Sequence, residues 1–380
     1  MIDVADAVRR FAPAYLDRHG ASMLPSHRRA LTDIAACRTA ELGGHLWRCT
    51  ACRAEVYSYH GCRNRSCPKC HTDQTRRWLE ARTAELLPTP YFHVTVTVPA
   101  ELRELFRRHQ TDGYGLLIGA TATAIIELAR DSRYVGGTVG VMAVRHTWTQ
   151  RLDYHPHVHC LVTGGGVSAA GSHGHPSVRD GFLVPVKALG KLIRGKLRAE
   201  IASKLPGAAV PAEVWRKPWV VYCVPWGEGE QAVLDYLARY VFRTAITNRR
   251  ITAIDDDTVT FQYKKRDGAA GQWRSCTVSG HEFLRRFCQH VLPKGFHKVR
   301  YYGLWHPSKR ALAGRARQML LFDRKQPLPA EPIGTVVVAS PEATPPRVCP
   351  HCGKPGLILV RRLTPTRYPP PIRQSAPGPP

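Results

Sequence analysis

The sequence is poor in acidic residues and in long uninterrupted apolar segments. Only 29 aspartates and glutamates stand against 55 lysines and arginines. The N-terminal stretch MIDVADAVRRFAP carries acids and has no apolar core, so we expect no secretory signal peptide. The longest apolar run, GYGLLIGATATAIIELA, is interrupted by threonines, glycines and Glu127, which favours a buried helix over a membrane span. These absences predict a cytoplasmic protein that makes no membrane contact.

The shortage of acids leaves a formal net charge of +26, which predicts nucleic acid or another polyanion as the partner. A nucleotide cofactor is not expected. Gly190 to Lys196 resembles the start of a phosphate-binding loop, but Leu197 stands where serine or threonine must bind Mg²⁺. The periodicity there predicts one continuous helix rather than a loop between a strand and a helix.

Cysteine is plentiful, with twelve residues, and in a reducing compartment these are more often metal ligands than disulfides. Two Cys-x-x-Cys pairs separated by a short basic segment predict one tetrahedral zinc site on Cys49, Cys52, Cys67 and Cys70. Spare ligands for a second ion lie nearby: Cys37, His45, His60 and Cys62. In the tail, Cys349 and Cys352 form half of a zinc ribbon, which either borrows ligands from elsewhere or binds nothing.

The order of predicted elements indicates an α+β fold with a central antiparallel sheet flanked by helices, preceded by a helical and zinc-binding domain. Short amphipathic helices are expected from Val4 to Leu42. Strands are expected at YFHVTVTVP, GTVGVMAVRHTWTQ, HVHCLVTGGG, FLVPV, WVVYCVPW, TVTFQYKKR, WRSCTVS and HKVRYYGLW. We expect a helical and zinc-binding domain over 1–88, an α+β domain over 89–322, and a largely disordered proline-rich tail over 323–380.

The stretch LDYHPHVHCLVTGGG suggests a metal site at the start of a strand. His157 and His159 are two residues apart, so their imidazoles share one face of the strand. A short hairpin would bring a third ligand from the preceding strand, either His146 or Gln150. Three neutral N and O ligands leave coordination positions open to substrate, and Mg²⁺ or Mn²⁺ suits a site completed by phosphate oxygens. His155 is left to shape the turn or to contact substrate.

The segment GEQAVLDYLARYVFRTAITN predicts an amphipathic helix. Tyr236 and Tyr240 are i,i+4 neighbours on a face that also holds Arg243. Two tyrosines on a helix often merely flank a core. Beside a metal site in a basic chain, a phenol is also a competent nucleophile toward phosphorus, and a nearby cation such as Arg243 favours phenolate.

Four motifs in this order, CRNRSCPKC, HPHVHC, YLARYVFRTAITNRR and VLPKGFHKVRYYGL, resemble the rolling-circle transposases of the insertion sequence 91 family. The similarity covers roughly residues 10–320. The resemblance implies a zinc-binding, DNA-binding domain over 1–88 and a nuclease domain with an antiparallel sheet over 89–322. It also implies a divalent metal on the two histidines of a His-hydrophobic-His (HUH) motif and two catalytic tyrosines. The HUH pair falls on His157 and His159, the tyrosine pair on Tyr236 and Tyr240, and the zinc knuckles on the four cysteines of the two Cys-x-x-Cys pairs.

The resulting hypothesis is a transposase that nicks and rejoins single-stranded or hairpin DNA at mobile-element ends through a 5′-phosphotyrosine, and that is nucleoid-associated when bound to DNA. Phosphate contacts are expected from Arg53, Arg63, Arg65, Arg76 and Arg77. The oligomeric state stays open. Three alternatives stay open: a zinc-finger DNA-binding protein without catalysis, a metal-dependent hydrolytic nuclease with Asp153 as base, and a carboxylate-triad transposase. The last is disfavoured because Asp255 to Asp257 fits a hairpin turn.

Overall fold

The computed structural model describes residues 2–70, 87–168, 174–176, 181–228, 232–233, 236, 240–241, 244–265, 271–323 and 347–366. The chain divides into two compact units, residues 1–71 with 330–380, and residues 72–329. Within the described ranges no helix is both long and apolar enough to cross a bilayer. The mixture of helices and antiparallel sheets confirms the α+β class predicted from the sequence.

The first unit begins with two helices, α1 (Val4–His19) and α2 (Pro25–Ala35). Asp3 caps α1 by accepting hydrogen bonds from the backbone amides of Ala5 and Asp6, which satisfies donors that have no partner inside the helix. Pro25 occupies the first turn of α2, where no amide hydrogen is needed. The two helices bury one apolar stripe each, consisting of Val4, Val8, Phe11, Leu31 and Ile34.

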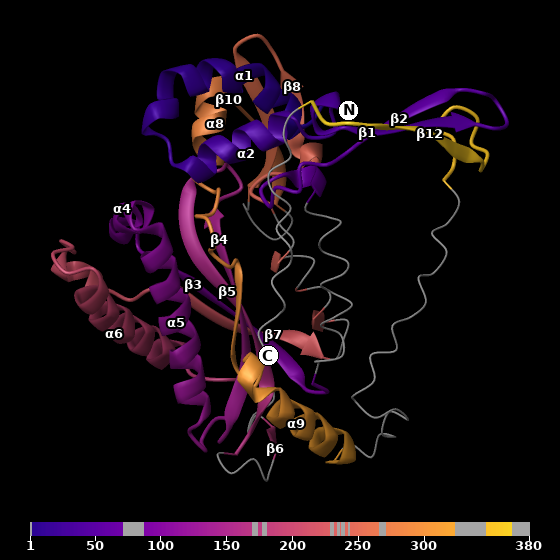
Figure 1. The fold of residues 1–380 in the computed structure, drawn as a ribbon. Helices are drawn as coiled ribbons and strands as arrows, with labels where there is room; N and C mark the ends of the chain where they lie inside the picture. Colours follow the sequence, from indigo (N-terminus) through magenta and orange to yellow (C-terminus); the bar gives the residue numbers. More distant parts are fainter. Residues whose placement is uncertain are drawn as a thin grey trace. The chain divides into compact units, whose positions relative to one another are not determined.

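A three-stranded antiparallel sheet completes the first unit. Its strands are β1 (Gly44–Cys49), β2 (Glu55–Tyr59) and β12 (Leu357–Leu363), in the order β12-β1-β2 (Figure 1). The strand from the end of the chain thus pairs along the whole of β1, from Gly44 opposite Leu363 to Cys49 opposite Leu357. This pairing differs from the expectation of a separate, largely disordered tail, because residues 347–366 contain a strand that belongs to the N-terminal unit.

The second unit is built on a six-stranded antiparallel sheet in the order β11-β4-β5-β3-β7, with β6 paired to β5. Its strands are β3 (Pro90–Thr97), β4 (Thr138–Trp148), β5 (Tyr154–Val167), β6 (Gly174–Pro176), β7 (Val221–Glu228) and β11 (Val299–Gly303). The β4–β5 hairpin predicted from the sequence is confirmed, and its register places His146 opposite His157. The two faces of this sheet have different partners.

One face of the sheet packs on helices and forms the main hydrophobic core. Helices α4 (Arg103–Arg108), α5 (Gln110–Ala129) and α6 (Val186–Lys204) lie beside the sheet (Figure 1). The apolar run predicted to be a buried helix is α5, and the glycine-containing basic segment lies inside α6, as expected. The core joins these helices to alternate strand residues: Val94, Val96, Val141, Ala143, Val158, Cys160 and Val162.

The second unit also contains a smaller sheet and two further helices. Strands β8 (Ile251–Ile254), β9 (Thr258–Lys265) and β10 (Gln272–Ser279) carry helix α8 (Gly280–Cys288), and α9 (Arg310–Asp323) follows β11. Asp255 to Asp257 connect β8 to β9, as predicted for a turn. The strand expected at FLVPV is wrong: Leu183 and Val184 are buried without forming a regular strand, and Pro185 is the N-cap of α6.

Candidate functional site

Three histidines on two neighbouring strands meet on the face of the sheet opposite α5 and α6. His157 and His159 come from β5, and His146 comes from β4 as the cross-strand partner of His157. One ring nitrogen from each histidine lies within 4.8 Å of those of the other two. Val158, between the two β5 histidines, points into the main core, so the alternation of the strand separates the apolar side chain from the ligands.

A hydrogen bond on one nitrogen of each imidazole indicates which nitrogen would bind a metal ion. His157 donates from Nδ1 to the carbonyl oxygen of His155 at 2.7 Å, which leaves Nε2 as its ligand atom. His146 donates from Nε2 to the carbonyl oxygen of Tyr240 at 2.6 Å, which leaves Nδ1. His159 Nδ1 lies 3.0 Å from His93 Nε2 and 3.2 Å from Thr95 Oγ1. Such partners fix ring orientation in metal sites.

Burial keeps these imidazoles neutral. It lowers the pKa of His157 to about 4, and it holds the pKa of His146 well below the ordinary value, with further repulsion from His159 and Lys298. Neutral imidazole is the form that binds a metal ion. Among the described residues, no carboxylate joins the three nitrogens. Three neutral donors fit a divalent ion but supply no negative charge to it. An ion bound there would therefore attract a phosphate group.

Tyr240 packs directly against this cluster, whereas Tyr236 lies deeper. The Tyr240 ring centroid is 4.2 Å from that of His159 and 4.7 Å from that of His93, and the side chain is half-buried. Tyr236 is fully buried, 5.0 Å from Tyr240 between ring centroids. Its hydroxyl has no hydrogen-bond partner among the described residues, and burial raises its pKa well above the ordinary value. Burial therefore disfavours the phenolate form of Tyr236.

The sequence did not single out three residues that position these groups. His93 on β3 contacts His159 and both tyrosines. Lys298 donates to the carbonyl oxygen of Val241 at 2.8 Å, next to the Tyr240 carbonyl held by His146, and burial lowers its pKa to about 7. Trp226 on β7 lies 5.7 Å from Tyr240 between ring centroids. His93 lies in a segment whose alternating apolar and polar residues predict a strand. That alternation does not indicate which strand pairs with it.

Other predicted residues have different positions. Gln150 is exposed in the turn between β4 and β5, where its carbonyl oxygen accepts a hydrogen bond from Arg250. His155 Nδ1 lies 3.0 Å from Arg103 Nη2, outside the group of three ligands. Arg243 lies outside the described residues.

The general base considered for a hydrolase is Asp153, which is engaged elsewhere. It accepts a hydrogen bond from Thr149 at 2.9 Å, lies 3.7 Å from Arg286, and is exposed. It is not part of the histidine group.

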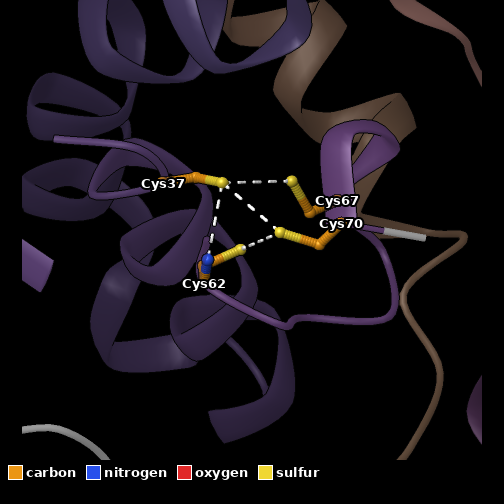
Figure 2. Close-up of side chains that lie close together, drawn as sticks. All are labelled: Cys37, Cys62, Cys67 and Cys70. Carbon is orange, nitrogen blue, oxygen red and sulfur yellow. Dashed lines mark hydrogen bonds between the residues drawn. The ribbon is translucent and has the colours of Figure 1, made fainter. Parts of the chain in front are cut away.

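A separate four-cysteine cluster lies in the first unit (Figure 2). Cys37 Sγ is 3.5 Å from Cys70 Sγ and 3.7 Å from Cys67 Sγ, and Cys62 Sγ is 3.7 Å from Cys70 Sγ. A tetrahedral ion with Zn–S bonds of about 2.3 Å requires sulfurs about 3.8 Å apart, so the arrangement fits zinc. Hydrogen bonds among the thiols hold the pKa of Cys37 far below its ordinary value and raise the pKa of Cys62 and of Cys67, so Cys37 is the thiol that ionises most readily.

This cluster corrects the predicted zinc ligands. The single site expected from Cys49, Cys52, Cys67 and Cys70 is wrong, because its two Cys-x-x-Cys pairs lie at opposite ends of the β1–β2 hairpin. Cys49 ends β1 at the hairpin tip, whereas Cys62 to Cys70 follow β2 back past its base. Five residue steps along a strand span about 16 Å.

The spare ligands predicted for a second zinc ion also do not form one site. Cys37 and Cys62 join Cys67 and Cys70, whereas Cys49 and Cys52 lie beside Cys349 and Cys352. His45 and His60 belong to neither cluster, and their rings contact each other with centroids 5.0 Å apart. The tip and the base of the hairpin therefore each carry four cysteines.

The arginines predicted to contact DNA surround these clusters in sequence. Arg53 and Arg63 are exposed, and Arg65 is half-buried. Arg53 follows Cys52 at the hairpin tip, and Arg63 follows Cys62 in the other cluster. Arg76 and Arg77 lie outside the described residues.

Comparisons with known proteins cover segments of both units. Residues 140–312 match the family described as "Putative transposase", and residues 7–98 match the "Transposase zinc-binding domain". The chain is 39% identical over 319 residues to "Putative transposase y4qJ" of Sinorhizobium fredii, covering 79% of each chain. No solved structure matches. The protein is a transposase.

A second relative narrows the assignment. The chain is 26% identical over 289 residues to the "Transposase for insertion sequence element IS801" of Pseudomonas savastanoi pv. phaseolicola, covering 72% of this chain and 68% of the relative. The matched zinc-binding domain is that of the insertion sequence 91 family. This chain belongs to the insertion sequence 91 family of transposases, as its motifs indicated.

Proposed function

We propose that this transposase nicks and rejoins single-stranded or hairpin-forming DNA at the ends of a mobile element through a 5′-phosphotyrosine intermediate. The observation that supports this best is the contact between Tyr240 and His159, whose ring centroids are 4.2 Å apart. A nucleophile next to a set of metal ligands is the arrangement that metal-assisted transesterification requires. In this mechanism the histidines bind the metal ion and the tyrosines attack the phosphate.

We assign the divalent ion, Mg²⁺ or Mn²⁺, to His146, His157 and His159. When bound, it would supply Lewis-acid polarisation of the scissile phosphate. The protein would contribute the fixed orientation of its ligands: the His155 carbonyl holds His157, and His93 with Thr95 holds His159. Gln150, in an exposed turn, is the weaker choice for a third ligand.

In the chemical step, the Tyr240 oxygen forms a bond to phosphorus as the bond from phosphorus to the 3′ oxygen breaks. The phenolic proton passes, through solvent, to the leaving oxygen, which becomes a 3′ hydroxyl. Reversal of the same exchange with another 3′ hydroxyl rejoins the strand, so no nucleotide energy source is needed. Hydrogen bonds from His146 to the Tyr240 carbonyl and from Lys298 to the Val241 carbonyl would hold the nucleophile's backbone on the sheet.

We propose that Tyr240 attacks first and that Tyr236 attacks a second phosphate. Tyr240 is half-buried and beside the ligands, whereas Tyr236 is buried and its raised pKa disfavours phenolate. The second attack therefore requires Tyr236 to become accessible after the first. Arg243 remains our prediction for the cation that favours phenolate.

DNA would be held largely through its phosphates by the exposed arginines of the cysteine-rich unit, Arg53 and Arg63. Single-stranded substrate follows from the chemistry, because a phosphate must approach the nucleophile and three ligand nitrogens together. The net charge of +26 would speed association with any nucleic acid.

The test uses labelled single-stranded oligonucleotides carrying element-end sequences, incubated with the full chain and Mn²⁺ or Mg²⁺. On a denaturing gel we expect a covalent protein–DNA adduct that is lost in Tyr240→Phe and in His157→Ala. Tyr263→Phe is the control variant, because Tyr263 lies on β9 and packs against Arg151 rather than against the three histidines. Cleavage without an adduct would instead support a hydrolytic nuclease, and binding without cleavage would support a zinc-finger DNA-binding protein.

A further inference from the structure

The Cys49 and Cys349 pairs have the same backbone conformation although they lie at opposite ends of the chain. In the first turn, the Cys49 amide donates to the Ala54 carbonyl at 3.0 Å, and the Arg53 amide donates to the Cys49 carbonyl at 2.9 Å. In the second turn, the Cys349 amide donates to the Lys354 carbonyl at 2.9 Å, and the Gly353 amide donates to the Cys349 carbonyl at 2.9 Å.

The residue that follows the second cysteine of each pair also has the same conformation in the two turns. Arg53 has a φ of 60° and Gly353 a φ of 70°, so both turns pass through the left-handed region at the same point. For arginine this conformation is uncommon, and it is retained only where surrounding structure requires it. The two turns are equivalent Cys-x-x-Cys knuckles, which is the local structure of zinc ribbons.

The two knuckles face each other. Cys49 Sγ is 3.7 Å from Cys352 Sγ, and Cys52 Sγ is 3.7 Å from Cys349 Sγ. These distances equal, within 0.1 Å, the roughly 3.8 Å edge of a tetrahedron with Zn–S bonds of about 2.3 Å. All four sulfurs lie within 4.8 Å of one another, and all four cysteines are free of disulfides.

The surrounding structure is already assembled for this geometry. The sheet pairing between β1 and β12 ends at Cys49 opposite Leu357, immediately beside both knuckles. The backbone amide of Thr50 also donates to the Gly356 carbonyl at 3.0 Å, so the two turns are bonded to each other as well as to themselves. Adding a Cβ at Gly356 would place it 2.4 Å from Thr50 Oγ1, which shows how closely the turns approach.

We propose that Cys49, Cys52, Cys349 and Cys352 bind a second structural zinc ion, which fastens residues 347–363 to the N-terminal unit as a zinc ribbon. Neither matched family segment reaches Cys349, so this site extends the zinc-binding unit beyond residues 7–98. The proposal concerns the construction of this unit and is independent of the transesterification chemistry.

A metal is needed here because apolar burial is small. Five central residues of β12, Ile358 to Arg362, are exposed. Among the described residues of β1 that precede Cys49, Leu46 is the one large apolar side chain that is buried. A three-stranded sheet with so little covered surface is marginally stable by itself. Structural zinc sites contribute folding free energy directly in small domains of this kind.

The experiment measures zinc content of the full chain by mass spectrometry, with the histidine site blocked by His157→Ala in every sample. We expect Cys349→Ser/Cys352→Ser to lose one zinc ion per chain, and Cys49→Ser/Cys52→Ser to lose one. The variant with all four substitutions should also lose only one, because both pairs serve the same ion. Cys276→Ser, a half-buried cysteine of β10 outside both clusters, should keep the full content.

Two outcomes would overturn the proposal. Unchanged zinc in Cys349→Ser/Cys352→Ser would show that the tail binds none, and loss of two ions in the four-cysteine variant would show that the pairs serve different ions. Because a serine variant can fail to fold, Cys349→His provides a second test. Imidazole is a zinc ligand, so this variant should retain the ion and shift the charge-transfer absorption of the Co²⁺-substituted protein. A folded Cys349→His protein with one ion fewer would contradict the proposal.

Discussion

Replacing Tyr236 with phenylalanine should stabilise the protein while leaving the first cleavage intact. The Tyr236 hydroxyl is fully buried and has no hydrogen-bond partner among the described residues. A buried polar group in this state costs about 1–3 kcal/mol, and Tyr236→Phe removes it without changing the volume of the ring. For a unit of this size each kcal/mol shifts the unfolding temperature by about 2–4 °C. We therefore expect a rise in Tm with the single-strand adduct retained.

The assay combines thermal unfolding at fixed zinc and Mn²⁺ concentrations with the adduct gel, because bound metal also shifts apparent stability. Tyr240→Phe is the matched variant: it should abolish the adduct, and its half-buried position offers no comparable gain in stability. A Tyr236→Phe protein with a lower Tm would refute the energetic reasoning. A Tyr236→Phe protein that forms no first adduct would refute the order of attack.

Three further predictions concern metal, pH and salt. His93→Ala should weaken Mn²⁺ binding about 10- to 100-fold by freeing the His159 ring, measured by calorimetry, and an unchanged Kd would contradict its positioning role. Burial lowers the pKa of His290 to about 3, so its contribution to stability is complete above pH 6.5 and is lost as the pH falls toward 3. Urea unfolding of His290→Gln should accordingly show a shallower loss over that range than the parent protein, and parallel curves would refute this. Arg53→Ala should reduce the slope of log binding constant against log salt by about one, measured by fluorescence anisotropy, whereas an unaltered slope would remove Arg53 from the phosphate contacts.

Local patterns predicted much of the second unit. The alternation of YFHVTVTV and HVHCLVTGGG specifies strands, and the short connection between β4 and β5 places them as an antiparallel hairpin. That hairpin predicts either His146 or Gln150 beside the β5 histidines, and the structure places His146 opposite His157. The segment FLVPV was mistaken for a strand because a short apolar run has the same pattern whether it forms a strand or a buried approach to a helix.

Contacts between distant segments were not predictable in this way. The position of His93 depends on β3 lying between β5 and β7, and strand order is not encoded in periodicity. The division of the cysteines depends on β12 pairing with β1, a contact between the two ends of the sequence. Spacing predicts the Cys-x-x-Cys pairs as metal-binding candidates, but it does not say which pairs meet when a hairpin separates them.

The pairing of β12 with β1 also sets the order in which the protein can be completed during its synthesis. Cys49 and Cys352 are separated by 303 positions. At elongation rates of about 5–20 residues per second, the hairpin waits on the order of 15 to 60 seconds for its third strand to leave the ribosome. The second unit, which ends before that strand, can fold in the meantime. A message truncated after residue 329 would thus yield a chain with the histidines and tyrosines but with an unfinished N-terminal unit.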